Sequence, residues 1–126
     1  MSKTPKNLTV ASVINEIAKS IHAANHHWWH DEKGRPIKRN KGELLCLIHS
    51  EVSEAMEGER KNLFDDKLPD RKMAEVELAD AIIRIFDYAA GFGYDLGGAM
   101  VEKLAFNAKR EDHTHKARKG KHGKKF

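Results

Sequence analysis

Two pairs of acidic residues in the middle of the chain have the same spacing. Glu51 and Glu54 are three positions apart in EVSE, and Glu77 and Asp80 are three apart in ELAD. Residues at this spacing lie on one side of an α-helix, so each pair would present two carboxylates together. Carboxylate oxygens suit a hard cation such as Mg²⁺. Two such helices would hold more than one divalent cation, whereas each pair alone is also typical of a solvated charged face.

The second acidic pair is the more informative. Glu77 and Asp80 lie in a segment that is apolar on almost every side, which predicts a helix buried on most sides. Burying carboxylates without a counter-charge is costly. Arg84, on the same stripe, would neutralise one acid, whereas a metal ion would neutralise both. The stripe alone favours neither explanation.

A basic stripe follows near the end of the chain. Lys103, Asn107 and Arg110 are spaced i, i+4 and i+7, which places two cations and an amide on one helix face. Such a row suits a polyphosphate, although an ordinary exposed basic face has the same pattern. Combined with metal-binding carboxylates, the row indicates phosphoryl or nucleotidyl transfer.

Helices are the elements that must position these residues. Apolar residues recur at three- and four-residue steps in four segments, and no convincing strand separates them. Asp70 and Asp95 are expected as N-caps of the last two helices, and Gly91 is expected to end the third. The sequence predicts an all-α, four-helix bundle-like domain over residues 1–112, with helices at about Leu8–Trp28, Lys41–Lys61, Arg71–Ala90 and Leu96–Asp112.

Length and composition fit one domain. The chain has 126 residues, 40% hydrophobic and 33% charged, with no apolar run of membrane-spanning length. No secretory signal is recognisable, so we expect a cytoplasmic protein without a membrane partner. The single cysteine, Cys46, lies in an apolar run and is expected to be a small core residue.

The positive charge is concentrated in residues 113–126. This segment carries six Lys and Arg and no acid, which leaves 17 basic and 19 acidic residues in 1–112. We expect it to be a flexible basic tail. Such a tail is a weak signal for nucleic-acid binding, so a nucleic-acid partner is not favoured.

Aromatic and histidine residues cluster around residue 28. Trp28 or Trp29 would be able to stack on a nucleobase, although at least one of them is expected to be structural. His22, His26 and His30 share a helical spacing. Without a convergent cysteine or acid, they do not indicate a zinc site.

The ordered set of motifs resembles the MazG-like nucleoside triphosphate pyrophosphohydrolases, within the all-α NTP pyrophosphatase superfamily. The resemblance covers most of the chain. It lies in GELLCLIHSEVSEAMEGERK, in VELADAIIRIFDYA, in EKLAFNAKREDH and in the closing GKKF. The stretch HHWWHDE is also similar to this family. A single E-x-x-E is not specific, but the ordered set is.

The resemblance implies a function and a set of site residues. Glu51, Glu54, Glu77 and Asp80 would be the catalytic Mg²⁺ ligands for two or more ions, which Mn²⁺ can replace. The residues Lys103, Asn107 and Arg110 would contact phosphates or sugar. The reaction would convert a (d)NTP and water into (d)NMP and pyrophosphate, with purine deoxynucleotides such as dGTP favoured. Family members are homodimers or homotetramers whose bundle is completed across the interface.

Three other classes of protein are alternatives to a pyrophosphohydrolase. A ferritin-like di-iron protein needs Glu-x-x-His motifs, and the sequence contains none. A helical nucleic-acid-binding module using the basic tail is the alternative, but it leaves the acidic stripe around Asp80 unexplained. A catalytically inactive assembly protein would not need all four acids.

Overall fold

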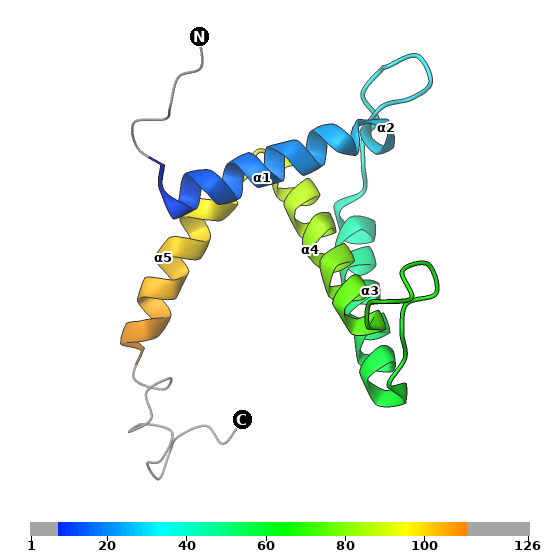
Figure 1. Ribbon diagram of the computed structural model, residues 1–126. Helices are drawn as coiled ribbons and strands as arrows, with labels where there is room; N and C mark the ends of the chain where they lie inside the picture. Colours follow the sequence, from blue (N-terminus) through cyan, green and yellow to red (C-terminus); the bar gives the residue numbers. More distant parts are fainter. Residues whose placement is uncertain (1–7, 111–126) are drawn as a thin grey trace. The chain divides into compact units, whose positions relative to one another are not determined.

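The computed structural model describes residues 8–110, where every regular element is an α-helix and the only β pairing is two isolated β-bridges. This confirms the all-α prediction, whereas the predicted basic tail, residues 113–126, lies outside the described residues. No helix in this range is long and apolar enough to cross a membrane. The helices are α1 (Val10–Ala24), α2 (His26–Trp29), α3 (Lys41–Lys61), α4 (Met73–Gly91) and α5 (Leu96–Lys109) (Figure 1).

Helix α3 begins and ends where the sequence predicts. At its start, the side chain of Asn40 accepts a hydrogen bond from the backbone N–H of Glu43 at 3.0 Å, an N-cap not anticipated from the sequence. At its end, Asn62 adopts the left-handed conformation with φ of 52°, as is common just after a helix. Both ends are therefore fixed by local chemistry.

The predicted first helix is interrupted. Asn25 has φ of −95° and ψ of 16°, so α1 ends at Ala24 and the short α2 follows as a separate turn. The apolar periodicity continues across the break, which is why the pattern alone predicts one helix. Because of this break, Trp28 and Trp29 lie on α2 and not on α1.

The predicted N-cap of α4 is wrong. Asp70 lies in the loop before the helix, where backbone bonds from Asp65 N–H to Arg71 and from Met73 N–H to Leu63 hold an extended bridge. The helix begins at Met73, and the Glu75 carboxylate accepts the backbone N–H of Lys72 at 3.1 Å. By contrast Asp95 does cap α5, accepting the N–H of Gly98 at 2.8 Å.

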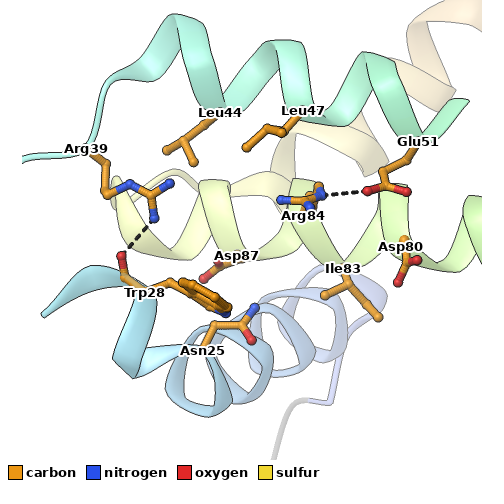
Figure 2. A pocket seen from close by; sticks show the side chains of 10 residues that line it. All are labelled: Asn25, Trp28, Arg39, Leu44, Leu47, Glu51, Asp80, Ile83, Arg84 and Asp87. Carbon is orange, nitrogen blue, oxygen red and sulfur yellow. Dashed lines mark hydrogen bonds and ion pairs between the residues drawn. The ribbon is translucent and has the colours of Figure 1, made fainter. Parts of the chain in front are cut away.

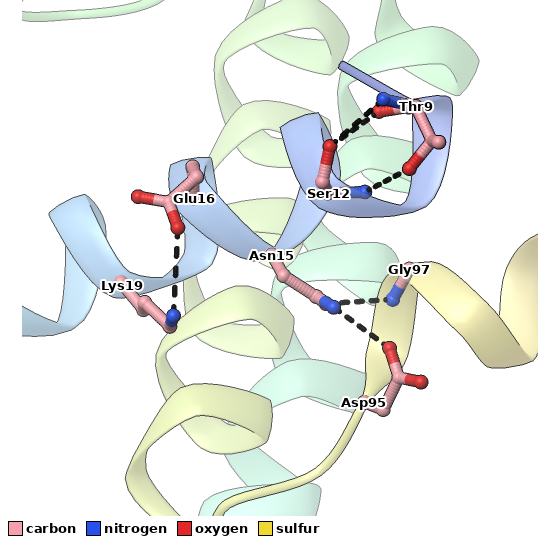
Figure 3. A network of polar contacts seen from close by, with 7 residues as sticks. All are labelled: Thr9, Ser12, Asn15, Glu16, Lys19, Asp95 and Gly97. Carbon is pink, nitrogen blue, oxygen red and sulfur yellow. Dashed lines mark hydrogen bonds and ion pairs between the residues drawn. The ribbon is translucent and has the colours of Figure 1, made fainter. Parts of the chain in front are cut away.

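The chain divides into two compact units. The terminal unit comprises residues 1–15 and 95–126, and the central unit comprises residues 16–94. In the terminal unit, Asn15 of α1 accepts the N–H of Gly97 at 2.8 Å and donates to Asp95 at 2.7 Å (Figure 3). Gly97 is buried against the backbone of Ala11, where a Cβ would clash with the carbonyl oxygen. The two helix starts are joined by these contacts.

In the central unit, α3 and α4 run side by side along their length (Figure 1). Small residues are buried between or beside the helices: Ala55, Gly58, Ala74, Ala81 and Ala89. A Cβ at Gly58 would meet the side chain of Met73, so the helices approach closely at this point. Such small residues allow the two backbones to pack tightly.

One half-buried carboxylate, that of Asp87, fastens α2 to α4. The indole N–H of Trp29 donates to both oxygens of Asp87 at 3.0 and 3.1 Å, and His22 Nδ1 lies 2.7 Å from the same carboxylate. Trp29 is 8% exposed, and its ring lies on Gly91, where no side chain would fit. Asp87 therefore determines where the tryptophan turn lies on α4.

Two expectations about burial are corrected. Cys46 is exposed rather than part of the core, and α4 is not buried on most sides, since Leu78 and Ile82 are exposed. The reason is geometric: within its unit α3 packs along its length only against α4, so one side of each helix is covered. Val52 and Met56 on α3 are likewise exposed.

We predict that Asp87→Ala lowers the free energy of unfolding by about 1–3 kcal/mol, because it leaves the buried indole N–H of Trp29 without an acceptor. Urea unfolding followed by circular dichroism measures the change. Asp66→Ala, which removes an exposed carboxylate, is the control. Equal stability of the two variants would contradict the anchoring role of Asp87.

Candidate metal centre

Three carboxylates from two helices converge on one point. Glu51 of α3 and Glu77 and Asp80 of α4 each place an oxygen within 4.8 Å of the other two. The contact of α3 with α4 brings Glu51 to the pair, and the i, i+3 spacing brings Glu77 and Asp80 together. In residues 8–110 no other group of three acidic, histidine or cysteine side chains is arranged in this way.

The electrostatics of this acidic cluster are unfavourable without a cation. The pKa of Glu77 is raised to about 8, because its carboxyl shares a hydrogen bond with Glu51, is partly desolvated and also interacts with Glu54. The pKa of Asp80 is raised by desolvation and by the charge of Glu51, against which Arg84 acts. Exposed Glu54 lies outside this group of three carboxylates but interacts with Glu77, so the structure brings together three of the four predicted acids.

Arg84 neutralises only part of the charge. Its Nε donates to Glu51 Oε1 at 3.0 Å, and Glu51 is 9% exposed. Among the described residues no basic side chain forms an ion pair with Glu77 or Asp80. Arg84 is therefore the counter-charge of Glu51, but Glu77 and Asp80 have no basic ion-pair partner in the described part of the chain.

The donor set fits Mg²⁺ or Mn²⁺. All candidate ligand atoms are carboxylate oxygens, which hard divalent cations prefer, and no sulfur or imidazole ligand competes within the cluster. A bound cation would also remove the cause of the raised pKa values, since it favours the ionised carboxylates.

A cavity of about 420 Å³ adjoins the cluster (Figure 2). Its two ends differ in chemistry. Glu51, Asp80 and Arg84 lie at one end, whereas Trp28 and Arg39 lie at the other, where Arg39 Nη1 donates to the Trp28 carbonyl at 2.8 Å. The volume lies within the range of small-molecule sites. The lining residues are Asn25, Trp28, Arg39, Leu44, Leu47, Glu51, Asp80, Ile83, Arg84 and Asp87.

The two adjacent tryptophans have different environments. Trp28 is 59% exposed and lines the cavity, so its ring is accessible to a ligand. Trp29 is buried and bonded to Asp87, which confirms that at least one tryptophan is structural. A stacking role for Trp29 stays a prediction.

The basic stripe belongs to the terminal unit. Lys103 and Arg110 both lie beside the ring of Phe106, at 4.9 and 5.9 Å from its centre, as expected for residues on one side of α5. Asn107 between them has a buried Oδ1 with no hydrogen-bond partner in residues 8–110. Their contact with a substrate stays a prediction.

Sequence reasoning missed Asn25 and Arg39. Asn25 lies at the break between α1 and α2, which the apolar pattern conceals. Arg39 lies in the charged loop between α2 and α3, outside the segments predicted to be helical. The signal available was its position directly before Asn40, the cap of the helix that carries Glu51.

Comparison of the chain with protein-family models, with curated proteins and with solved structures found no match. The acidic cluster and the cavity beside it are therefore the features from which a function can be inferred.

We predict that Glu77→Gln and Asp80→Asn each weaken Mg²⁺ and Mn²⁺ binding about tenfold or more, because each removes a ligand oxygen with its charge. Isothermal titration calorimetry measures the affinity. Glu59→Gln, which removes an exposed carboxylate from the same helix as Glu51, is the matched control. Wild-type affinity in both cluster variants would exclude the proposed metal site.

A second prediction concerns pH. Because the folded pKa of Glu77 is about 8, above its usual 4.5, the native state binds more protons than the unfolded state between these values. The stability of the metal-free protein must therefore fall as pH rises from about 5 to 8. Thermal unfolding in a chelator across this range measures it. Glu77→Gln should flatten the profile, and an unchanged slope in that variant would contradict the assignment.

Proposed function

We propose that the chain is a Mg²⁺-dependent nucleoside triphosphate pyrophosphohydrolase, which converts a (d)NTP and water into (d)NMP and pyrophosphate. The observation that carries the proposal is the convergence of Glu51, Glu77 and Asp80, of which Glu51 and Asp80 line one end of a cavity. A cluster of carboxylates able to bind cations, beside a cavity with arginine and tryptophan side chains, suits a triphosphate with an aromatic base.

Glu51, Glu54, Glu77 and Asp80 would hold the metal. Two or more Mg²⁺ ions would neutralise the triphosphate and lower the pKa of a bound water. The two-helix arrangement supports this use, because carboxylates from different elements can approach one ion from different sides.

The chain's own residues would supply the remaining chemistry. A carboxylate of the cluster would accept the proton of the attacking water. Arg84 uses Nε for Glu51, and its terminal N–H groups have no partner among the described residues. With 41% of its side chain exposed in the cavity, Arg84 is available to a phosphate oxygen as charge develops.

The other end of the cavity would receive the base. The ring of Trp28 would stack on it, and the Asn25 amide would offer a donor and an acceptor. Stacking tolerates any base, so the preference for purine deoxynucleotides such as dGTP rests on the family resemblance. Trp29 would support this end indirectly, through its bond to Asp87.

Assembly and location complete the proposal. We infer a cytoplasmic homodimer or homotetramer in which a MazG-like four-helix bundle is completed by a second copy. The exposed apolar side chains of Val52, Met56, Leu78 and Ile82 support it, since a partner would cover them. In that assembly the α5 residues Lys103, Asn107 and Arg110 would contact phosphates.

We predict Mg²⁺-dependent release of monophosphate and pyrophosphate from a panel of eight common NTPs and dNTPs. Chromatography must resolve these products from diphosphate and phosphate. Asp80→Asn and Glu54→Gln should lower kcat at least a hundredfold, because the reaction needs the bound cation. Glu59→Gln should retain wild-type activity.

The outcome that contradicts the proposal is no turnover of any nucleotide although Mg²⁺ binds. Nucleic-acid binding that weakens steeply with salt and is unaffected by Asp80→Asn would instead favour the helical nucleic-acid-binding module.

A further inference from the structure

The central unit has a second cavity, of about 710 Å³, beside Trp29. Lys38, Arg39 and Lys41 contribute three cations to its walls, and Trp29 and Phe92 contribute aromatic rings. None of its lining residues is an aspartate or glutamate. We call it the basic cavity, and the one beside the metal cluster the acidic cavity.

The cations of the basic cavity contact neutral groups. Lys41 Nζ lies 4.7 Å from the centre of the Phe92 ring and 3.4 Å from the Tyr94 hydroxyl. The Arg39 guanidinium lies 5.7 Å from the centre of the Trp29 ring. Within residues 8–110, neither of these cations nor Lys38 forms an ion pair with a carboxylate.

Several basic side chains elsewhere in the central unit do pair with an acid. Arg35 pairs with Asp31 at 2.8 Å, Lys61 with Glu57 at 2.8 Å and Arg71 with Glu75 at 3.3 Å. In each pair the acid is four positions away in the sequence. The basic cavity thus gathers three cations in one concave surface, and within residues 8–110 no acid pairs with them, whereas Arg35, Lys61 and Arg71 each have a local acid.

We propose that the basic cavity binds a phosphate-bearing small molecule at a site separate from the acidic cavity. The arginine offers planar donors that match phosphate oxygens, and the two lysines add charge. The Trp29 and Phe92 rings give the same cavity an apolar wall for a planar group. Its volume fits a mononucleotide rather than a folded partner. This inference does not depend on the proposed hydrolysis.

Arg39 lines both cavities. Its Nη1 holds the carbonyl of Trp28, the residue whose ring lines the acidic cavity. A phosphate that recruits Arg39 competes for this donor and so acts on the backbone that positions Trp28. Occupancy of the basic cavity is thereby coupled to the base end of the acidic cavity.

The test uses tryptophan fluorescence. The chain has two tryptophans, so Trp28→Phe leaves Trp29, in the wall of the basic cavity, as the sole fluorophore. We titrate this variant with inorganic phosphate and with AMP in a chelator, so that the acidic cluster holds no metal. The expected result is a saturable fluorescence change with both probes, and tighter binding of AMP than of inorganic phosphate.

Charge variants on the same background locate the site. Lys38→Ala with Lys41→Ala should weaken binding of both probes at least tenfold. The matched control is Lys33→Ala with Lys67→Ala, which removes two positive charges from exposed loops, and it should bind normally. Glu77→Gln should also bind normally. Lys38→Glu alone, at a side chain with no ion pair to lose, repeats the test without disturbing the aromatic contacts of Lys41.

Three results would overturn the proposal. The first is no saturable change with either probe. The second is equal affinity in the Lys38/Lys41 and Lys33/Lys67 variants. The third is a salt-sensitive preference for oligonucleotides over AMP, which would make this surface a nucleic-acid contact. Loss of nucleotide hydrolysis would not bear on it, since binding is measured without metal.

Discussion

The structure of the central unit depends on an imbalance of charge between two closely packed helices. Small residues along α3 and α4 let the backbones approach, and this approach brings Glu51 to Glu77 and Asp80. Arg84 is the one basic side chain of the described residues that pairs with this cluster, and it donates to Glu51, the most buried of the three carboxylates. The folded protein therefore holds a group of acidic side chains that the basic residues within 8–110 balance only in part.

The opposite end of the acidic cavity is held by a different interaction. Asp87 is also an acid on α4, yet its oxygens are fully engaged by the indole of Trp29 and by His22. Four acidic and basic residues on one stripe of α4 thus have distinct roles. Glu77 and Asp80 face the cluster, Arg84 bridges to α3, and Asp87 fixes α2. The same helix sets both ends of the cavity.

Much of this could be predicted from the sequence. Helix α3 is predicted to the residue, and the acids of α4 stand out because polar residues are rare in so apolar a segment. The errors have local causes. Asp70 is a good cap residue, but it lies in a turn that the backbone pairing of Asp65 with Arg71 and of Leu63 with Met73 closes, so the helix begins only at Met73. The break at Asn25 leaves the apolar period intact, so periodicity cannot detect it.

Other features depend on contacts between distant residues and are not visible in any spacing. Arg84 and Glu51 are 33 positions apart in the sequence, so no local spacing indicates that they form an ion pair. The sequence alone therefore does not show which acid the arginine neutralises. Cys46 was expected in the core because its neighbours are apolar, but that side of α3 is left uncovered. An apolar run indicates burial only when a second element is present to supply it.

The two adjacent tryptophans differ in how readily they can be replaced during evolution. Trp29 is fixed by Asp87 on one side and by Gly91 beneath its ring, so a different side chain there would require compensating changes on α4. Trp28 is held through its carbonyl, which every amino acid possesses, while its ring projects beside the cavity. Position 28 can accept many side chains without loss of the fold. The shape of the acidic cavity can therefore diversify among descendants of this sequence by single substitutions at one position, while the scaffold that presents that position stays the same.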